Sequence, residues 1–246
     1  MFNPRELEEA TRWLDGQAAG PRQPRRCGSI RWTTAVHLVI GDSIGRDSGL
    51  ASRMKNDVVL NRCRGGATAQ SIFAGLELDL RHWEMSATAH QLPRGWAVYW
   101  VSANNVYSRF TGGSNLDPGL MSTCSLNVQR TVEMLLTRTQ RILVLGPLPR
   151  LDGDLAGLAW EKTAAFHLER AAKRAVEAVA ANHTEARIQF VPLGRCLTKK
   201  QGGRHCVRPE CAGWFRGDLV HLSLSGYEKL ADAQHLPIWV RLGGSR

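Results

Sequence analysis

The chain lacks a long hydrophobic run. Its 246 residues contain no apolar stretch of the roughly 20 residues that a membrane-spanning helix needs. The first residues, Met1 to Glu9, are rich in glutamate and lack the basic start and the apolar core of a secretory signal. We therefore predict no transmembrane segment and a cytoplasmic location.

Cysteine is also scarce. The six cysteines are irregularly spaced, at Cys27, Cys63, Cys124, Cys196, Cys206 and Cys211. This pattern excludes a small protein held together by disulfides, and a chain of this length can bury a full hydrophobic core without them. A reducing compartment is therefore expected.

Four potential zinc ligands, Cys196, His205, Cys206 and Cys211, fall within sixteen residues. Zinc prefers four tetrahedral sulfur or nitrogen ligands, but this spacing matches no standard zinc finger. Free thiols are the favoured interpretation, with a zinc site and a Cys206–Cys211 disulfide as alternatives. We expect no metal and no cofactor.

Acidic residues are under-represented. The 22 Asp and Glu residues stand against 32 Lys and Arg, which gives a formal net charge of +10 and a pI of about 9.8. Basic residues concentrate at 21–26 and at 195–216, a segment that we interpret as a loop. Such a surface attracts polyanions, so RNA, DNA and anionic membranes are candidate partners, in contacts that would weaken with salt.

Composition divides the chain into two parts. Residues 1–32 comprise a short amphipathic helix at 4–16, with Asn3 and Pro4 at its start, and a linker rich in Gly, Pro and Arg. A solvated connector is the simplest interpretation of that linker. Residues 33–246 are predicted to form one domain.

From residue 35 onward, short apolar runs alternate with helix-like stretches. Strands are predicted at 35–40, 58–62, 97–101, 141–145 and 188–193, and helices at 44–54, 67–80, 120–138, 157–181 and 223–240. Because parallel strands need crossovers, this order predicts an α/β fold: a three-layer, flavodoxin-like α/β/α sandwich with a five-stranded parallel sheet. Ligands bind such sheets at the carboxyl ends of the strands.

Two of these strand ends carry glycine motifs. Gly41-Asp42-Ser43 follows the first strand and directly precedes a helix, which places the serine hydroxyl at the sheet edge and its backbone N–H in the first helical turn. Gly65-Gly66 follows the second strand, where glycine lets a backbone N–H approach a substrate oxygen. Each motif has a structural alternative, with Ser43 as a helix cap and Gly66 in an ordinary turn.

Asn104 follows the third strand, and Asp218-Leu219-Val220-His221 lies near the C-terminus. An Asn amide is a neutral donor for a developing oxyanion, although Asn at a strand end often closes a turn. The spacing of Asp218 and His221 lets the carboxylate orient the imidazole while the other ring nitrogen faces a nucleophile. A helix cap with a nearby histidine is the alternative.

In this order, the four motifs resemble those of the SGNH (GDSL-type) hydrolase family, which are Gly-Asp-Ser, Gly, Gly-x-Asn-Asp and Asp-x-x-His. The resemblance extends over about residues 35–240. Ser102 and Asn105 replace the glycine and the aspartate of the third motif, and Ile44 replaces a leucine after the first. None of these changes removes a group that the family's mechanism needs.

The resemblance implies a serine esterase that hydrolyses carboxylic esters through an acyl-enzyme. Ser43 would be the nucleophile, His221 the base, and Asp218 the residue that orients the base. The backbone N–H groups of Ser43 and Gly66 and the side chain of Asn104 would form the oxyanion hole. The chain does not place its serine in the Gly-x-Ser-x-Gly elbow of α/β-hydrolases.

The substrate is less visible in the sequence. No long apolar lid is present, so short acyl groups such as acetyl, on a small-molecule or lipid ester, are expected. The loop at 107–119 and the pair Trp214-Phe215 are candidate pocket walls, with ordinary packing as the alternative. The basic surface also fits retrotransposon-type proteins, in which similar esterase domains accompany RNA-binding parts. The alternative function is a catalytically weak scaffold that binds nucleic acid or membranes.

Overall fold

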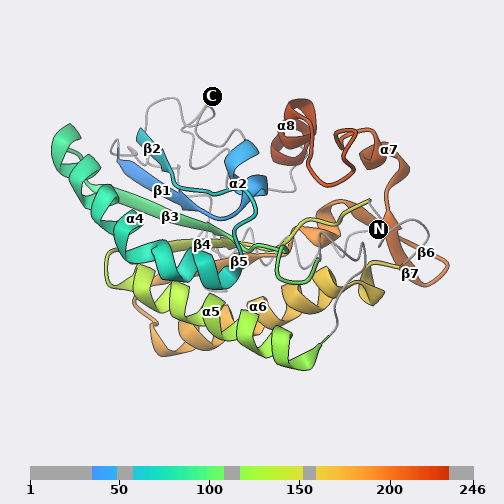
Figure 1. The fold of residues 1–246 in the computed structure, drawn as a ribbon, viewed down its shortest axis with the longest axis horizontal. Coiled ribbons are helices and arrows are strands. Elements are labelled where there is room, and N and C mark those ends of the chain that lie inside the picture. Colours follow the sequence, from blue (N-terminus) through green and yellow to red (C-terminus); the bar gives the residue numbers. More distant parts are fainter. Residues whose placement is uncertain (1–34, 49–57, 108–116, 152–158, 233–246) are drawn as a thin grey trace, which may run out of the picture.

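The computed structural model describes residues 35–48, 58–107, 117–151 and 159–232. These residues form a central sheet with helices on both faces (Figure 1). The helix predicted at 4–16 and the linker that follows it lie outside the described residues. So do the parts of the predicted helices at 49–54, 157–158 and 233–240.

Five parallel strands form the central sheet. They are β1 (Val36–Ile40), β2 (Val58–Asn61), β3 (Arg94–Trp100), β4 (Arg141–Leu145) and β5 (Arg187–Val191). Their spatial order is β2-β1-β3-β4-β5, and every neighbouring pair is parallel, which confirms the predicted fold class. β3 begins before the predicted residue 97, because Gly95 interrupts the apolar run that marks the strand in the sequence.

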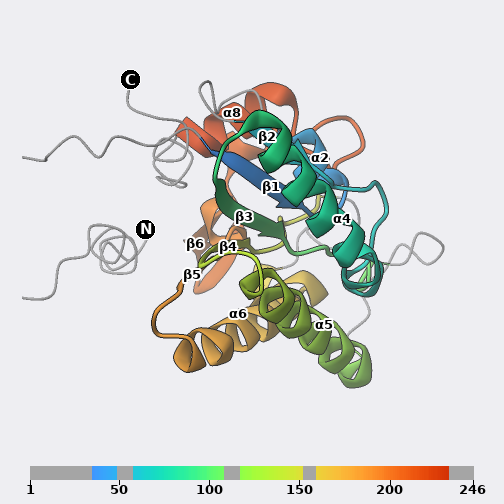
Figure 2. The same ribbon diagram turned by 90° about the vertical axis from the view of Figure 1, so that its left-hand side faces the viewer.

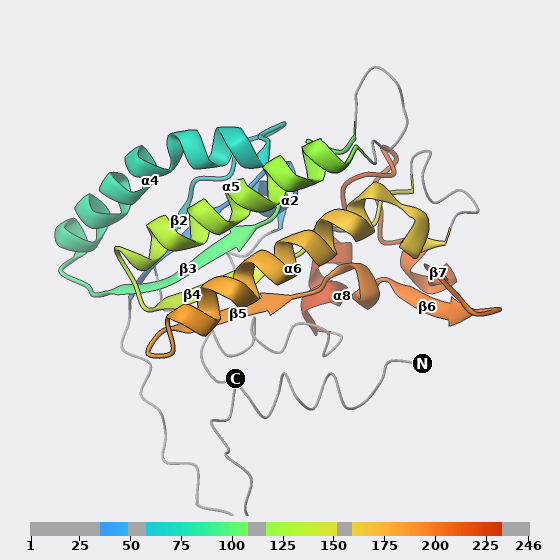
Figure 3. The same ribbon diagram turned by 90° about the horizontal axis from the view of Figure 1, so that it is seen from below.

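Three long helices cover one face of the sheet: α4 (Ala69–His90), α5 (Pro118–Leu136) and α6 (Ala164–Asn182) (Figure 3). The opposite face is covered by α8 (Leu224–Asp232) and the segment before it, and Ile44 of the short helix α2 (Ser43–Asp47) also packs there (Figure 2). In these described ranges, no helix is long and apolar enough to cross a bilayer.

α4 extends ten residues beyond the end that the sequence predicts at residue 80. Trp83 and Ala87 continue its buried face, and the Trp83 Nε1–H donates to the Val36 carbonyl at 2.8 Å. The sequence-based prediction ended the helix too early, because the apolar residues in its second half are widely spaced between polar ones. The added turns reach the far end of β1, where the Trp83 indole is buried against the sheet.

α6, in contrast, begins later than the predicted residue 157. A 3₁₀ turn at Trp160–Lys162 precedes it, and Thr163 caps it by accepting a hydrogen bond from the Phe166 N–H at 3.2 Å. A Thr cap satisfies one of the free N–H groups at a helix start, which fixes where the helix begins.

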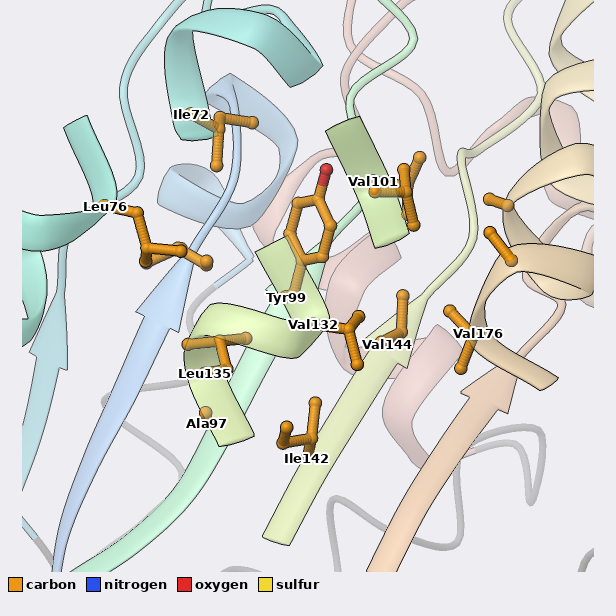
Figure 4. Packing of buried hydrophobic residues seen from close by; sticks show 14 of the residues in the cluster. Ile72, Leu76, Ala97, Tyr99, Val101, Val132, Leu135, Ile142, Val144 and Val176 are labelled. Carbon is orange, nitrogen blue, oxygen red and sulfur yellow. The ribbon is translucent and has the colours of Figure 1, made fainter. Parts of the chain in front are cut away.

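Two buried clusters hold the layers together. The larger lies between the sheet and α4, α5 and α6, and its side chains interdigitate (Figure 4). Those labelled in the figure are Ile72, Leu76, Ala97, Tyr99, Val101, Val132, Leu135, Ile142, Val144 and Val176. The smaller cluster lies on the other face, where the Trp100 and Tyr227 rings meet edge to face with centroids 6.3 Å apart. Each buried large side chain contributes about 1.5–3 kcal/mol.

The segment 195–216, interpreted above as a basic loop, contains regular structure. β6 (Thr198–Gln201) and β7 (Arg204–Val207) form an antiparallel hairpin, and the short helix α7 (Pro209–Ala212) follows. Gly202 and Gly203 both have positive φ, as a two-residue hairpin turn requires. The hairpin is hard to detect in the sequence because its strands are short and carry mostly polar residues.

The packing of α4 can be tested with two leucines two residues apart. Leu76 is fully buried against the sheet, whereas Leu78 is 54% exposed. Leu76→Ala is expected to lower the free energy of unfolding by about 2–5 kcal/mol, because it leaves a cavity. Leu78→Ala should change it by less than about 0.5 kcal/mol. Urea denaturation measures both, and equal losses would show that α4 packs through a different face.

Candidate active site

The carboxyl ends of β1, β2 and β3 bring Ser43, Gly66 and Asn104 to one edge of the sheet, and the segment between α7 and α8 brings Asp218 and His221 there. Ser43 is the first residue of α2, directly after β1. Asp42 caps this helix, since its Oδ1 accepts the Ile44 N–H at 2.9 Å. The Asp-Ser pair therefore forms a tight strand-to-helix turn, with Ser43 partly exposed at the sheet edge.

Ser43, His221 and Asp218 form a continuous chain of hydrogen bonds. The Ser43 Oγ lies 2.7 Å from the His221 Nε2, although the two residues are 178 positions apart in the sequence. The His221 Nδ1 lies 2.8 Å from the Asp218 Oδ2. Because an ionised carboxylate only accepts, Nδ1 carries the proton, and Nε2 is left to accept from the Ser43 hydroxyl.

The geometry of the loop explains why Asp218 is a strong acceptor. Its Oδ1 accepts the backbone N–H groups of Val220 and His221, each at 2.9 Å. Burial raises the pKa of Asp218, but these two hydrogen bonds and the His221 side chain outweigh it and hold the pKa at about 2. Leu219 adopts a left-handed conformation with φ of 58°, which turns the backbone so that the carboxylate can reach the imidazole.

Backbone hydrogen bonds fix this loop to the rest of the domain. The Arg216 N–H donates to the His221 carbonyl, and the Leu151 N–H donates to the Leu219 carbonyl, both at 2.7 Å. Leu222, the residue after the histidine, is fully buried in the smaller cluster. The loop therefore joins the core at one end and the segment after β4 at its middle.

Asn104 lies beside the serine turn. Its Nδ2 donates to the Asp42 Oδ2 at 3.2 Å and to the Ala67 carbonyl at 3.0 Å. Ser102, which stands where the resembled family has glycine, donates its hydroxyl to the same Ala67 carbonyl at 2.6 Å and accepts the Asn104 N–H at 3.1 Å. The serine thus connects the turn after β3 to the loop after β2.

The second departure from the family pattern also has a local role. The Asn105 Oδ1 accepts the Ala69 N–H at 2.7 Å, at the first residue of α4. An amide oxygen can make this contact as well as a carboxylate would, and it adds no charge to the site. Sequence reasoning did not find these roles for Ser102 and Asn105, because both depend on residues more than thirty positions away.

Gly66 lies in the loop after β2 and has a left-handed φ of 72°, which favours glycine. The hydrogen bonds from Asn104 and Ser102 reach the next residue, Ala67, rather than Gly66 itself. Arg62 and Arg64 fix the loop by pairing with the buried carboxylate of Asp79 on α4. Gly66 therefore lies in the same loop as Ala67, whose carbonyl accepts a hydrogen bond from Asn104.

Asp42, at the serine turn, is buried, as is Asp79 on α4. Burial raises the pKa of Asp42 from 3.8 to about 6, although the hydrogen bond from the Ile44 N–H, the polar Ser102 side chain and the charge of His221 lower it in part. Its two oxygens accept from different segments, Oδ1 from α2 and Oδ2 from Asn104. Asp42 therefore joins the serine turn to the asparagine.

A pocket opens beside Ser43 and Asn104. Its lining consists of Asp42, Ser43, Ile44, Trp100, Val101, Ala103, Asn104, Pro147, Leu148, Arg150 and Val220. The residues from 147 to 150 were missed by sequence reasoning, although their position after a parallel strand is the signal that identified the others. Trp214 and Phe215 instead pack with the smaller cluster, which favours the packing interpretation, and residues 108–116 of the loop at 107–119 lie outside the described residues.

The cysteines do not form a metal site in the part of the chain that the structure describes. There, no group of three or more His, Cys, Asp or Glu residues is placed to hold a metal ion. Cys196, Cys206 and Cys211 are free thiols, so the disulfide alternative between Cys206 and Cys211 is wrong. His205 instead contacts Glu161, in the 3₁₀ turn before α6.

The burial of Asp42 predicts how the stability of the protein depends on pH. Because folding raises the pKa of Asp42, its contribution to stability is fully present below pH 3.8 and is lost as the pH rises through about 6. Asp42→Asn, which stays neutral, should therefore gain stability relative to the wild type by about 3 kcal/mol between pH 3 and pH 7.5. Urea denaturation across this range measures the difference, and parallel stability curves would contradict it.

Comparison with known proteins relates the fold to solved structures. No protein-family model matches the chain, and no curated protein sequence is similar to it. A GDSL-like lipase from Bacteroides thetaiotaomicron superposes with a TM-score of 0.56 at 14% identity, over 96% of this chain and 97% of the other.

Two further solved structures show the same likeness. A lipase/acylhydrolase from Enterococcus faecalis has a TM-score of 0.53 and 15% identity, over 87% of this chain and all (100%) of the other. A member of the lipolytic G-D-S-L family from Veillonella parvula has a TM-score of 0.54 and 16% identity, over 85% and 100%. The fold implied by the sequence motifs is thus confirmed, and the chain has the SGNH (GDSL-type) hydrolase fold.

Proposed function

We propose that this protein is a serine esterase that hydrolyses carboxylic esters through a Ser-His-Asp triad. The observation that carries the proposal is the unbroken hydrogen-bond chain from the Ser43 Oγ through both ring nitrogens of His221 to the Asp218 carboxylate. The alternatives for the individual motifs, such as a helix cap, do not require this alignment. The fold shared with solved acylhydrolases supports the same function.

In the first half-reaction, the Ser43 Oγ attacks the ester carbonyl while the His221 Nε2 takes the hydroxyl proton. The tetrahedral intermediate collapses, the bond to the alcohol oxygen breaks, and His221 returns the proton to the leaving alcohol. Water then attacks the acyl-enzyme, with His221 again as base, and releases the acid and the free serine. Throughout, Asp218 stabilises the imidazolium and keeps the ring oriented.

The developing oxyanion needs donors on the opposite side of the carbonyl. We assign this role to the backbone N–H groups of Ser43 and Gly66 and to the Asn104 Nδ2. In the structure, both N–H groups of the Asn104 amide have acceptors, and the bond to the Asp42 Oδ2 is the longer of the two, at 3.2 Å. Donation to the oxyanion would replace this longer bond, and Asp42 would hold the amide in place until then.

The pocket favours a small acyl group. Pro147, Leu148 and Val220 supply short apolar walls next to Ser43. Such walls suit acetyl and similar groups better than a long acyl chain. The retrotransposon-type setting, the contacts with nucleic acid or membranes and the cytoplasmic location stay predictions from the sequence.

Removal of the nucleophile or the base provides the direct test. Ser43→Ala and His221→Ala are each expected to abolish hydrolysis of 4-nitrophenyl acetate and covalent labelling by a fluorophosphonate, because attack needs both groups. Ser225→Ala, an exposed serine on α8, is the matched control and should keep both activities. A folded wild-type protein that is inert to both reagents would refute the esterase proposal.

The oxyanion role of Asn104 has a different signature. Asn104→Ala should lower kcat by about 10²–10³-fold, since one donor to the oxyanion is lost. Labelling by a fluorophosphonate should slow but still proceed, because Ser43 and His221 remain in place. Complete loss of both, as in Ser43→Ala, would instead show that Asn104 acts through the structure of the turn.

A further inference from the structure

Asp79 is fully buried in the middle of α4, although a carboxylate is costly to remove from water. Its charge is balanced from the loop after β2. The Arg62 Nε donates to the Asp79 Oδ1 at 2.9 Å, and the Arg64 guanidinium pairs with the Asp79 Oδ2. Loss of one partner from a buried ion pair is strongly destabilising, whereas an exposed pair contributes little. The burial of Asp79 therefore ties this loop firmly to α4.

Gly75 lies one turn before Asp79, on the same face of α4. A glycine inside a helix costs about 0.5–1 kcal/mol relative to alanine. Here it makes room for the Arg64 side chain. A Cβ at position 75 would lie 2.9 Å from the Arg64 Cζ, whereas carbon atoms in contact lie about 3.5–4.0 Å apart. Gly75 and Asp79 together therefore determine where the Arg64 guanidinium lies.

Arg64 is also the first residue of a β-turn that contains Gly66. The Ala67 N–H donates to the Arg64 carbonyl at 3.1 Å, and Gly66, the third residue, has the positive φ that a type II turn requires there. In the described ranges, no hydrogen bond engages the Gly66 N–H. The Arg64 N–H donates to the Gly41 carbonyl at 3.0 Å, two residues before Ser43. The position of Arg64 therefore determines where a free backbone donor lies relative to the nucleophile.

The other end of this turn is bonded to the second proposed oxyanion donor. The Ala67 carbonyl accepts the Asn104 Nδ2 at 3.0 Å and the Ser102 hydroxyl at 2.6 Å. The turn at 64–67 is thus attached to the segment after β3 at its end and to α4 at its start. Without the attachment to α4, the start of the turn would keep only its backbone hydrogen bonds.

We propose that Asp79 is a positioning residue for the oxyanion hole, which acts through Arg64 to hold the turn at 64–67 so that the Gly66 N–H can donate to the oxyanion. This inference rests on the proposed esterase function and extends its machinery to α4. Oxyanion donors work because they are fixed before the charge develops. A displacement of about 1 Å in a group that contacts the transition state can lower turnover by about 10²-fold.

Replacement of the carboxylate by an amide tests the inference directly. Asp79→Asn has nearly the same size, but it has one acceptor oxygen where the carboxylate has two, and its NH₂ group only donates. It therefore cannot hold both Arg62 and Arg64. The kcat for 4-nitrophenyl acetate should fall by about 10–100-fold, with KM nearly unchanged, because the affected donor acts mainly in the transition state.

Gly75→Ala displaces Arg64 without changing any charge. Alanine is the better helix former by about 1 kcal/mol, so the substitution does not weaken α4 through propensity. It should lower kcat by about 10-fold. The control is Leu135→Ala, at a fully buried position on α5, which should lose about 2–5 kcal/mol of stability. Assayed below its unfolding transition, this control should keep the wild-type kcat.

A double variant assigns the effect to Arg64. Arg64→Gln alone should lower kcat about as much as Asp79→Asn does. Combination of the two substitutions should lower kcat no further than either one alone, because both remove the same contact. Urea denaturation shows which variants are folded at the assay temperature. If Asp79→Asn does not fold, Gly75→Ala and Arg64→Gln still decide.

Three outcomes overturn the inference: a wild-type kcat in folded Asp79→Asn or Gly75→Ala, an equal loss of kcat in Leu135→Ala, or additive losses in the double variant. Labelling of Ser43 by a fluorophosphonate separates this failure from failure of the proposed function. A wild type that labels and hydrolyses the ester, with variants that keep its kcat, remains an esterase and loses only the positioning role of Asp79. An inert wild type overturns both proposals.

Discussion

Burial of a single parallel sheet on both faces is the constraint from which the rest of this structure follows. The crossovers through α4, α5 and α6 return along one face of the sheet, and the residues around α8, which follow the last strand, cover the other. The strands then end at a common edge, because all five run in the same direction. Residues far apart in the sequence, such as Asp42 and Asn104, therefore come into contact at this edge.

At that edge, a small network of buried polar groups replaces apolar packing. Asp42 accepts from α2 and from Asn104, while the Ala67 carbonyl accepts from Ser102 and Asn104. Such a network is stable only when its members are satisfied, since an unpaired buried group costs about 1–3 kcal/mol. This requirement explains why a serine and an asparagine can replace the glycine and the aspartate of the resembled family.

Burial of Asp42 places a titratable group beside the serine turn, and Asp218 has the opposite environment. Removal from water raises the pKa of Asp42 to about 6, whereas two backbone N–H groups and His221 hold that of Asp218 at about 2. The two carboxylates therefore suit different tasks near neutral pH. Asp218 stays ionised and orients the imidazole, and Asp42 positions the amide of Asn104.

The sequence by itself determined the sheet, the order of its strands along the chain and the residues at most strand ends, because hydrophobic periodicity and glycine motifs are local signals. Only the tertiary structure decided the extension of α4 through Trp83, the hairpin at 198–207, and the place of Arg150 beside Ser43. Each of these depends on contacts between distant segments: an indole buried against β1, two short polar strands pairing, and a turn after β4 bonded to Leu219. Local sequence patterns do not predict contacts between distant segments.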